Sequence, residues 1–126
     1  MGRYDESTLQ CQCVAWFRWQ YPKKRRLLFA IPNGAFLQGD AKKRAMRWAI
    51  LQKEGANPGT ADLFLSIPRG EFAGLYIEMK TPNGRQSKDQ AAFEQEVMEE
   101  GYGYAMPRTF EEFQRVVNQY LKTGKY

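Results

Sequence analysis

The sequence predicts an α/β fold in which a central mixed β-sheet is flanked by helices. Short apolar runs bounded by turn residues have strand length, at 26–31, 62–67, 74–80 and 102–106. Between them lie segments with helical spacing and capping residues, so the elements follow the order α-β-α-β-β-α-β-α, which is typical of a sheet layered against helices. Because 126 residues suit one hydrophobic core, we expect a single domain over 1–126.

The first element is a helix over about 4–21. Leu9, Cys13 and Phe17 recur at helical spacing, and Pro22 ends the pattern. The apolar run RLLFAI follows, between basic residues and a Pro-Asn-Gly turn, which indicates the first strand.

The middle of the chain predicts a helix followed by a hairpin. The helix begins at Gly39 or Asp40, with Asp40 as N-cap, and ends at Glu54 before Gly55. The runs DLFLSI and GLYIEMK are joined by the short turn PRGEFA, so we expect them to pair as antiparallel strands.

Two further helices enclose the last strand. Ser87 caps a helix that ends at about Glu100, and YGYAM then reads as a strand. In TFEE, Thr109 and Glu112 fit a capping box that opens a last helix to about Lys122.

The composition excludes several kinds of site. With no histidine, the chain cannot form a histidine-based triad, a histidine–metal nuclease site, a histidine phosphotransfer site or most zinc sites. Cys11 and Cys13 would point to opposite sides of a helix, which disfavours both a metal pair and a disulfide. We expect two free thiols, buried or half-buried. Any hydrolysis here must therefore use carboxylates, lysine and a hard metal ion.

The charge distribution suits a polyanionic partner. The 19 Lys and Arg residues exceed the 14 Asp and Glu residues, for a net charge of +5. The two basic clusters contain the candidate phosphate-contacting residues: Lys23, Lys24, Arg25, Arg26, Lys42, Lys43, Arg44 and Arg47. A surface for DNA or RNA and a solvated, lysine-rich surface fit this pattern about equally well.

The sequence also indicates a location. No apolar run approaches the roughly 18 residues needed to cross a bilayer, and the N-terminus has no signal-peptide pattern. We therefore expect a soluble, cytoplasmic protein with no membrane partner.

Charged residues end the strand-like run GLYIEMK. On an extended strand Glu78 and Lys80 share one face, about 6–7 Å apart along the strand. A solvated outer face would explain them. Alternatively, a short hairpin brings Asp62 to the same end of the sheet, where two carboxylates require a cation between them. Mg²⁺ suits such a pair, and a lysine beside it can orient or deprotonate a water or stabilise charge on a phosphate oxygen.

Helical phase brings two more polar residues toward this site. Gln90 lies on the face of its helix that should pack on the sheet, although Ser87 and Gln90 also fit a capping box, and the two roles can coexist. Glu6 shares a face with Leu9 and Cys13 and so points inward, although an acid near a helix start also favours the helix dipole.

These motifs carry a family resemblance over nearly the whole chain. GTADLFL, GLYIEMKTPNGRQSKDQAAF and GYGYAM, preceded by AIPNGA and LQKEGANPG, resemble the VRR-NUC (virus-type replication-repair nuclease) branch of the PD-(D/E)XK nucleases. Glu-x-Lys alone is a weak signal, but the ordered set is specific. One departure is that Ala61, rather than proline, precedes Asp62. The resemblance implies a restriction-endonuclease-like core.

The resemblance also implies roles for the site residues. Asp62, Glu78 and the backbone carbonyl of Met79 would bind Mg²⁺ or Mn²⁺, and Lys80 would be the catalytic lysine. Gln90 would be the motif glutamine and Glu6 the first-helix acid.

The activity implied is a metal-dependent, structure-selective DNA endonuclease without an organic cofactor. Compact chains of this kind resemble phage or prophage enzymes, which implies branched DNA such as a four-way (Holliday) junction in a bacterial or phage-infected cell. Cutting two strands symmetrically needs two sites, so we expect a homodimer. The alternative is a non-catalytic module that binds branched DNA or RNA and has a structural carboxylate cluster.

Overall fold

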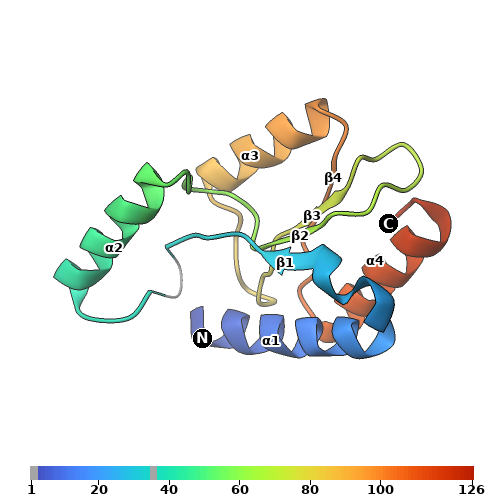
Figure 1. Ribbon diagram of the computed structural model, residues 1–126, viewed down its shortest axis with the longest axis horizontal. Helices are drawn as coiled ribbons and strands as arrows, with labels where there is room; N and C mark the ends of the chain where they lie inside the picture. The colour runs from blue at the N-terminus through green and yellow to red at the C-terminus, as the bar shows by residue number, and fades with distance from the viewer. Residues whose placement is uncertain (1–2, 35–36) are drawn as a thin grey trace.

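The computed structural model describes residues 3–34 and 37–126 and confirms the predicted fold class. Its elements are α1 (Arg3–Gln20), the 3-10 helix η1 (Pro22–Leu27), β1 (Leu28–Ala30), α2 (Ala41–Lys53), β2 (Leu63–Leu65), β3 (Leu75–Ile77), α3 (Lys88–Glu99), β4 (Gly103–Ala105) and α4 (Phe110–Thr123). The sheet order is β1-β2-β3-β4, with β1–β2 and β2–β3 antiparallel and β3–β4 parallel. As Figure 1 shows, α3 lies on one side of the strands, and α1 and α4 lie on the other. Among the described residues, no helix has the length and apolar character to span a membrane.

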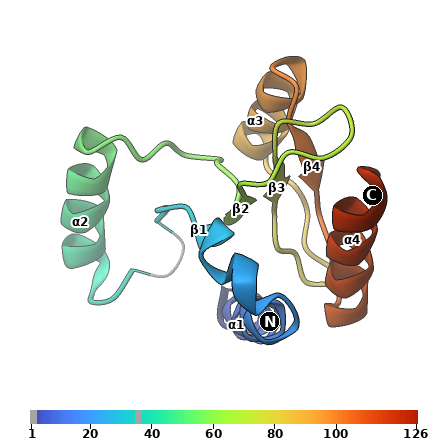
Figure 2. The ribbon, with the colours of Figure 1, turned by 45° about the vertical axis from the view of Figure 1, so that its right-hand side comes forward.

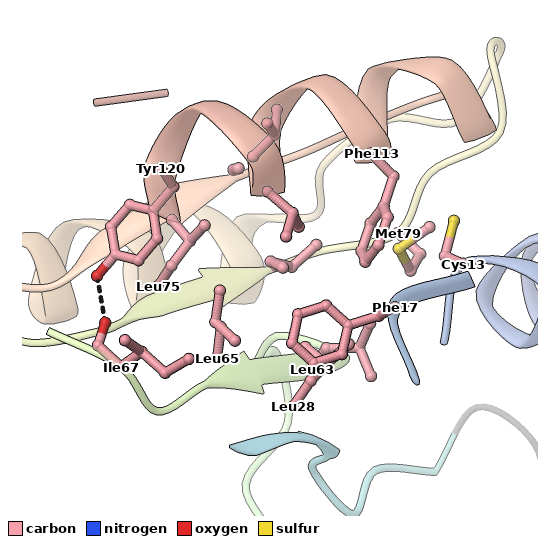
Figure 3. Packing of buried hydrophobic residues seen from close by; sticks show 14 residues of the cluster. Cys13, Phe17, Leu28, Leu63, Leu65, Ile67, Leu75, Met79, Phe113 and Tyr120 are labelled. Atoms are coloured by element: carbon pink, nitrogen blue, oxygen red, sulfur yellow. Dashed lines mark hydrogen bonds between the residues drawn. The ribbon is translucent and has the colours of Figure 1, made fainter. Parts of the chain in front are cut away.

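The hydrophobic core lies between the sheet and the pair α1 and α4 (Figure 3). Its buried members are Cys13, Phe17, Leu28, Leu63, Leu65, Ile67, Leu75, Ile77, Met79, Ala105, Phe113, Val116, Val117 and Tyr120. Each large apolar side chain stabilises the fold by about 1.5–3 kcal/mol through burial. The hydroxyl of Tyr120 donates a 2.6 Å hydrogen bond to the carbonyl of Ile67, so this buried polar group is satisfied.

The opposite face of the sheet carries aromatic rings beneath α3. Phe64 and Tyr76 lie across from each other on β2 and β3 with ring centroids 4.4 Å apart, and Phe93 of α3 packs edge-on against Tyr76 at 5.2 Å. Asp62 and Glu78 are each two residues from one of these rings, so their side chains start from the same face.

The predicted helix caps form, one of them only in part. Asp40 accepts a hydrogen bond from the Lys43 N–H at 2.9 Å. The capping box of Ser87 and Gln90 is complete. Thr109 accepts from the Glu112 N–H, but the Glu112 carboxylate accepts from the N–H of Arg108 instead of Thr109, so the predicted second box is half-formed.

Two local predictions are wrong. The strand predicted over 26–31 begins only at Leu28, because Pro22 starts the 3-10 helix η1, which extends to Leu27. Cys11 is exposed, although Cys13 is buried and both thiols are free as predicted. The reason is helical phase: α1 buries only the side that faces the sheet.

Helix α2 lies apart from the other helices. In Figures 1 and 2 it is the green helix at the left, beyond one end of the strands. None of its residues is buried. Its basic sequence lacks a continuous apolar stripe. The other three helices pack on a face of the sheet, whereas α2 does not.

Candidate active site

Three charged side chains lie buried where β2 begins and β3 ends. Leu63 pairs with Ile77, and continuing this antiparallel register by one residue places Asp62 opposite Glu78. The exposed fractions of Asp62, Glu78 and Lys80 are 8%, 2% and 6%. The solvated outer face considered for GLYIEMK is therefore wrong.

Asp62 joins the two strands and the loop after β1. Its Oδ2 accepts a 2.7 Å hydrogen bond from the backbone N–H of Met79, and its Oδ1 accepts one from Asn33 Nδ2 at 3.3 Å. These bonds hold the carboxylate beside Glu78 and fix the direction of the chain between Glu78 and Lys80.

Gln90 both caps α3 and contacts the buried charged cluster. Its Oε1 accepts from the Ser87 N–H at 2.8 Å, which completes the helix cap, and from Lys80 Nζ at 2.9 Å. Its Nε2 donates to Glu78 Oε2 at 2.8 Å. Lys80 Nζ also lies 3.8 Å from Glu78 Oε2. The start of α3 therefore positions the lysine and the glutamate together.

The electrostatics of the site favour a bound cation. Burial, and then the charge of Asp62, raises the pKa of Glu78 to about 9, and burial also raises the pKa of Asp62. Within the part of the chain that the structure describes, Glu78 Oε1 is buried and no donor group hydrogen-bonds to it. At neutral pH Glu78 therefore retains its proton unless a cation joins Lys80 and allows both carboxylates to ionise, so loss of this proton favours cation binding.

Glu6 of α1 reaches the same site. It is half-buried, and burial raises its pKa, while the charge of Lys80 has the opposite effect and that of Asp62 the same effect. The inward direction predicted from helical phase is confirmed. A third carboxylate thus borders the site, although the structure gives it no hydrogen bond to the other two.

A cavity of about 210 Å³ opens above these carboxylates. It is lined by Glu6, Asn33, Gly34, Trp48, Pro58, Gly59, Thr60, Asp62, Glu78, Ser87, Asp89 and Gln90. Its floor is the end of the sheet, and its walls come from α1, α2, the loop before β2 and the first turn of α3.

The donor set fits a hard divalent ion that keeps part of its water shell. Among the described residues, no three acidic or cysteine side chains gather closely enough to hold an ion unaided. Asp62 and Glu78 offer two carboxylates, one with a free buried oxygen. Mg²⁺ typically binds one or two carboxylates and retains several waters, so these residues suit it better than Ca²⁺, which takes six to eight oxygen ligands.

The two basic clusters lie in different places. Lys23 to Arg26 form η1, next to the C-terminal end of α1, whereas Lys42 to Arg47 belong to α2 at the other side of the molecule (Figure 1). Only α2 also contributes to the cavity, through Trp48. The structure therefore brings one cluster, and not both, beside the carboxylates.

Sequence reasoning missed three residues that shape the site. Asn33 lay within a recognised Pro-Asn-Gly motif without an assigned role, and Trp48 and Asp89 lie in helices where no sequence pattern marks a cavity wall. The Pro-Asn-Gly motif could have indicated Asn33. The positions of Trp48 and Asp89 in the cavity wall follow only from the tertiary fold.

Arg108 supports the loop between Lys80 and α3. Its guanidinium donates to the carbonyls of Thr81 at 2.9 Å and Gly84 at 2.6 Å, and Gly84 packs near the Lys80 stem. This loop is therefore fixed from α4's side of the sheet, and with it the direction of the lysine.

Comparisons with known proteins agree with this geometry. The family model of the VRR-NUC domain matches residues 3–109. A solved structure described as a VRR_NUC domain protein superimposes with a TM-score of 0.77 at 23% sequence identity, covering 95% of this chain and 90% of that one. No curated protein matches the chain. The matched region contains every residue of the buried charged cluster, and the chain belongs to the VRR-NUC family of nucleases.

Proposed function

We propose that this chain is a Mg²⁺- or Mn²⁺-dependent endonuclease that hydrolyses phosphodiester bonds in DNA. The observation that carries the proposal is the buried cluster of Asp62, Glu78 and Lys80 at the sheet end, with one Glu78 oxygen free to bind an ion. Family membership supports the same class of activity.

Each residue of the cluster has a separate task. Asp62 and Glu78 would hold the ion, with the Met79 carbonyl and waters completing its shell. When bound, the ion supplies a Lewis acid and a water of lowered pKa. The Lys80 amine, held by Gln90, orients the attacking water or stabilises charge on the phosphate oxygens, and Glu6 lines the cavity in which that water would lie.

The proposed substrate is branched DNA, such as a four-way junction. The support is the basic helix α2 beside the cavity, whose Lys42, Lys43, Arg44 and Arg47 can contact phosphates without reading bases. The η1 cluster would contact an arm farther from the cut.

We also propose a homodimer in the cytoplasm, because symmetric cutting of two strands requires two sites. Sedimentation as a monomer at assay concentrations would contradict the dimer.

A cleavage panel tests the activity. Purified protein is incubated with junction, fork, flap and linear DNA, with Mg²⁺, with Mn²⁺ or with chelator. We expect metal-dependent cleavage that falls at least about a hundredfold in Glu78→Ala and Lys80→Ala. The matched controls are Glu96→Ala and Lys122→Ala, which change exposed residues on α3 and α4. Undiminished cleavage by both site variants would reject the mechanism.

The same panel separates the nuclease from a non-catalytic binding module. Such a module would bind branched DNA equally well in chelator and would leave every substrate intact in Mg²⁺ or Mn²⁺. Its carboxylates would then have to be structural, yet Glu78 Oε1 finds no hydrogen-bond donor within the described residues and lies beside a second carboxylate, that of Asp62.

A further inference from the structure

Among the described residues that line the carboxylate cavity, Trp48 is the one aromatic side chain. It comes from α2, in which no residue is buried, and it is itself half-buried. Trp48 does not belong to the hydrophobic core and has no ring-to-ring contact among the described residues. Core packing therefore does not explain its position.

The indole is held from one side by the backbone of Gly34. A Cβ added at Gly34 would lie 3.2 Å from Cδ2, 3.3 Å from Cε3 and 3.7 Å from Cε2 of Trp48. These atoms include both carbons at the ring fusion, so Gly34 approaches a face of the ring and not its edge. The absence of a side chain at Gly34 permits this contact, which fixes the ring against the cavity wall.

The chemistry of the cavity favours one part of a nucleic acid at this ring. Glu6, Asp62, Glu78 and Asp89 make the other walls acidic, so an anionic group would approach them only through a metal ion. An indole surface instead attracts a flat ring, because stacking requires only an exposed π-face. The cavity, of about 210 Å³, has room for a flat ring of the size of a single nucleobase.

Cations lie next to the ring on the same helix. Arg44 precedes Trp48 by four residues, so the two side chains share a face of α2, and Arg47 is its immediate neighbour. The guanidiniums of both arginines donate to the loop before α2, at Gly39 and Gln38, with further N–H groups left for phosphates. A stacking ring flanked by phosphate-binding cations is the usual arrangement for binding single-stranded nucleic acid.

We propose that Trp48 stacks on an unpaired nucleobase next to the scissile phosphate, so that the site selects DNA with an unstacked nucleotide at the branch point. This inference rests on the proposed function, since it takes the carboxylates to be the place of cleavage. It assigns branch selectivity to a defined side chain of the cavity wall.

The test uses forked DNA with 2-aminopurine at one unpaired branch-point position, because stacking on an indole quenches its fluorescence. Binding is measured in Ca²⁺, on this DNA and on a copy with an abasic site at that position. We expect wild-type protein to quench the probe. We expect Trp48→Ala to abolish the quenching and to weaken binding to the base-containing fork roughly tenfold or more, while leaving binding to the abasic fork unchanged.

Two further variants keep the test independent of folding. Trp48→Phe retains a ring and should retain most of the discrimination between the forks, whereas Trp48→Leu retains apolar volume and should lose it. Equal binding of both forks by wild type, or equal discrimination by Trp48→Leu and Trp48→Phe, would overturn the inference. Quenching by a wild-type protein that cuts no DNA would support the Trp48 contact and reject the nuclease. Cleavage with no dependence on Trp48 would support the nuclease and reject the Trp48 contact.

Discussion

Asp62 Oδ2 accepts a 2.7 Å hydrogen bond from the backbone N–H of Met79, seventeen residues along the chain. This bond links the residue before β2 to the residue that separates Glu78 from Lys80. One carboxylate oxygen is thus structural, while the carboxylate as a whole also faces Glu78.

The two roles of Asp62 can be separated by substitution. Asp62→Ala leaves the buried Met79 N–H without an acceptor, so we expect it to lower the free energy of unfolding by about 1–3 kcal/mol. Asp62→Asn keeps an acceptor and removes the repulsion with Glu78, so in chelator its stability should equal or exceed that of wild type. Urea unfolding in chelator measures both. An asparagine variant as unstable as the alanine variant would contradict this division.

Metal binding should stabilise the folded protein through Glu78. A ligand present at ten times its Kd adds about 1.4 kcal/mol, which for a chain of this size raises Tm by about 5 °C. We expect Mg²⁺ or Mn²⁺ to produce such a rise in wild type and in Glu96→Gln, and to leave the Tm of Glu78→Gln unchanged. A rise of equal size in Glu78→Gln would place the ion elsewhere.

The cap and site roles of Gln90 should respond to different substitutions. Gln90→Glu retains an acceptor for Ser87 N–H and for Lys80, but it cannot donate to Glu78 and adds a negative charge there. We expect nearly normal helix stability with cleavage reduced at least about tenfold. Ser87→Ala removes a cap hydrogen bond and should cost about 1 kcal/mol of stability with most activity retained. The reverse pattern in parallel unfolding and cleavage assays would refute the assignment.

The two cysteines should differ sharply in reactivity. Burial, with a smaller effect of Glu111, raises the pKa of the Cys13 thiol to about 12, whereas Cys11 is exposed. Because the thiolate is the reactive form, at pH 8 only about one Cys13 in ten thousand is ionised. We expect Ellman's reagent to titrate one thiol in native protein and two in guanidinium. Rapid reaction of both thiols in native protein would show that α1 does not bury Cys13.

The parts of the site that sequence could predict are those defined by short-range rules. A short connection over 66–74 joins β2 to β3 as an antiparallel pair, and this pairing brings Asp62 opposite Glu78. Helical phase likewise turned Gln90 and Glu6 inward, and both reach the site.

What sequence could not predict depends on distant segments. Trp48 lies in a helix that packs on neither sheet face, so no apolar periodicity marks the ring as a cavity wall. Arg108 bonds to carbonyls 24 to 27 residues away. The residue type alone carries no signal of that contact, because arginine is ordinarily an exposed cation. The separation of the two basic clusters also follows only from the tertiary fold.

The most direct measurement is anomalous diffraction from crystals soaked in Mn²⁺. We predict a peak within bonding distance of one oxygen each of Asp62 and Glu78, on the side bordered by Glu6 and away from the core. No peak there at saturating Mn²⁺, or a peak held by other residues in protein that cuts DNA, would show that these paired acids are not the metal site.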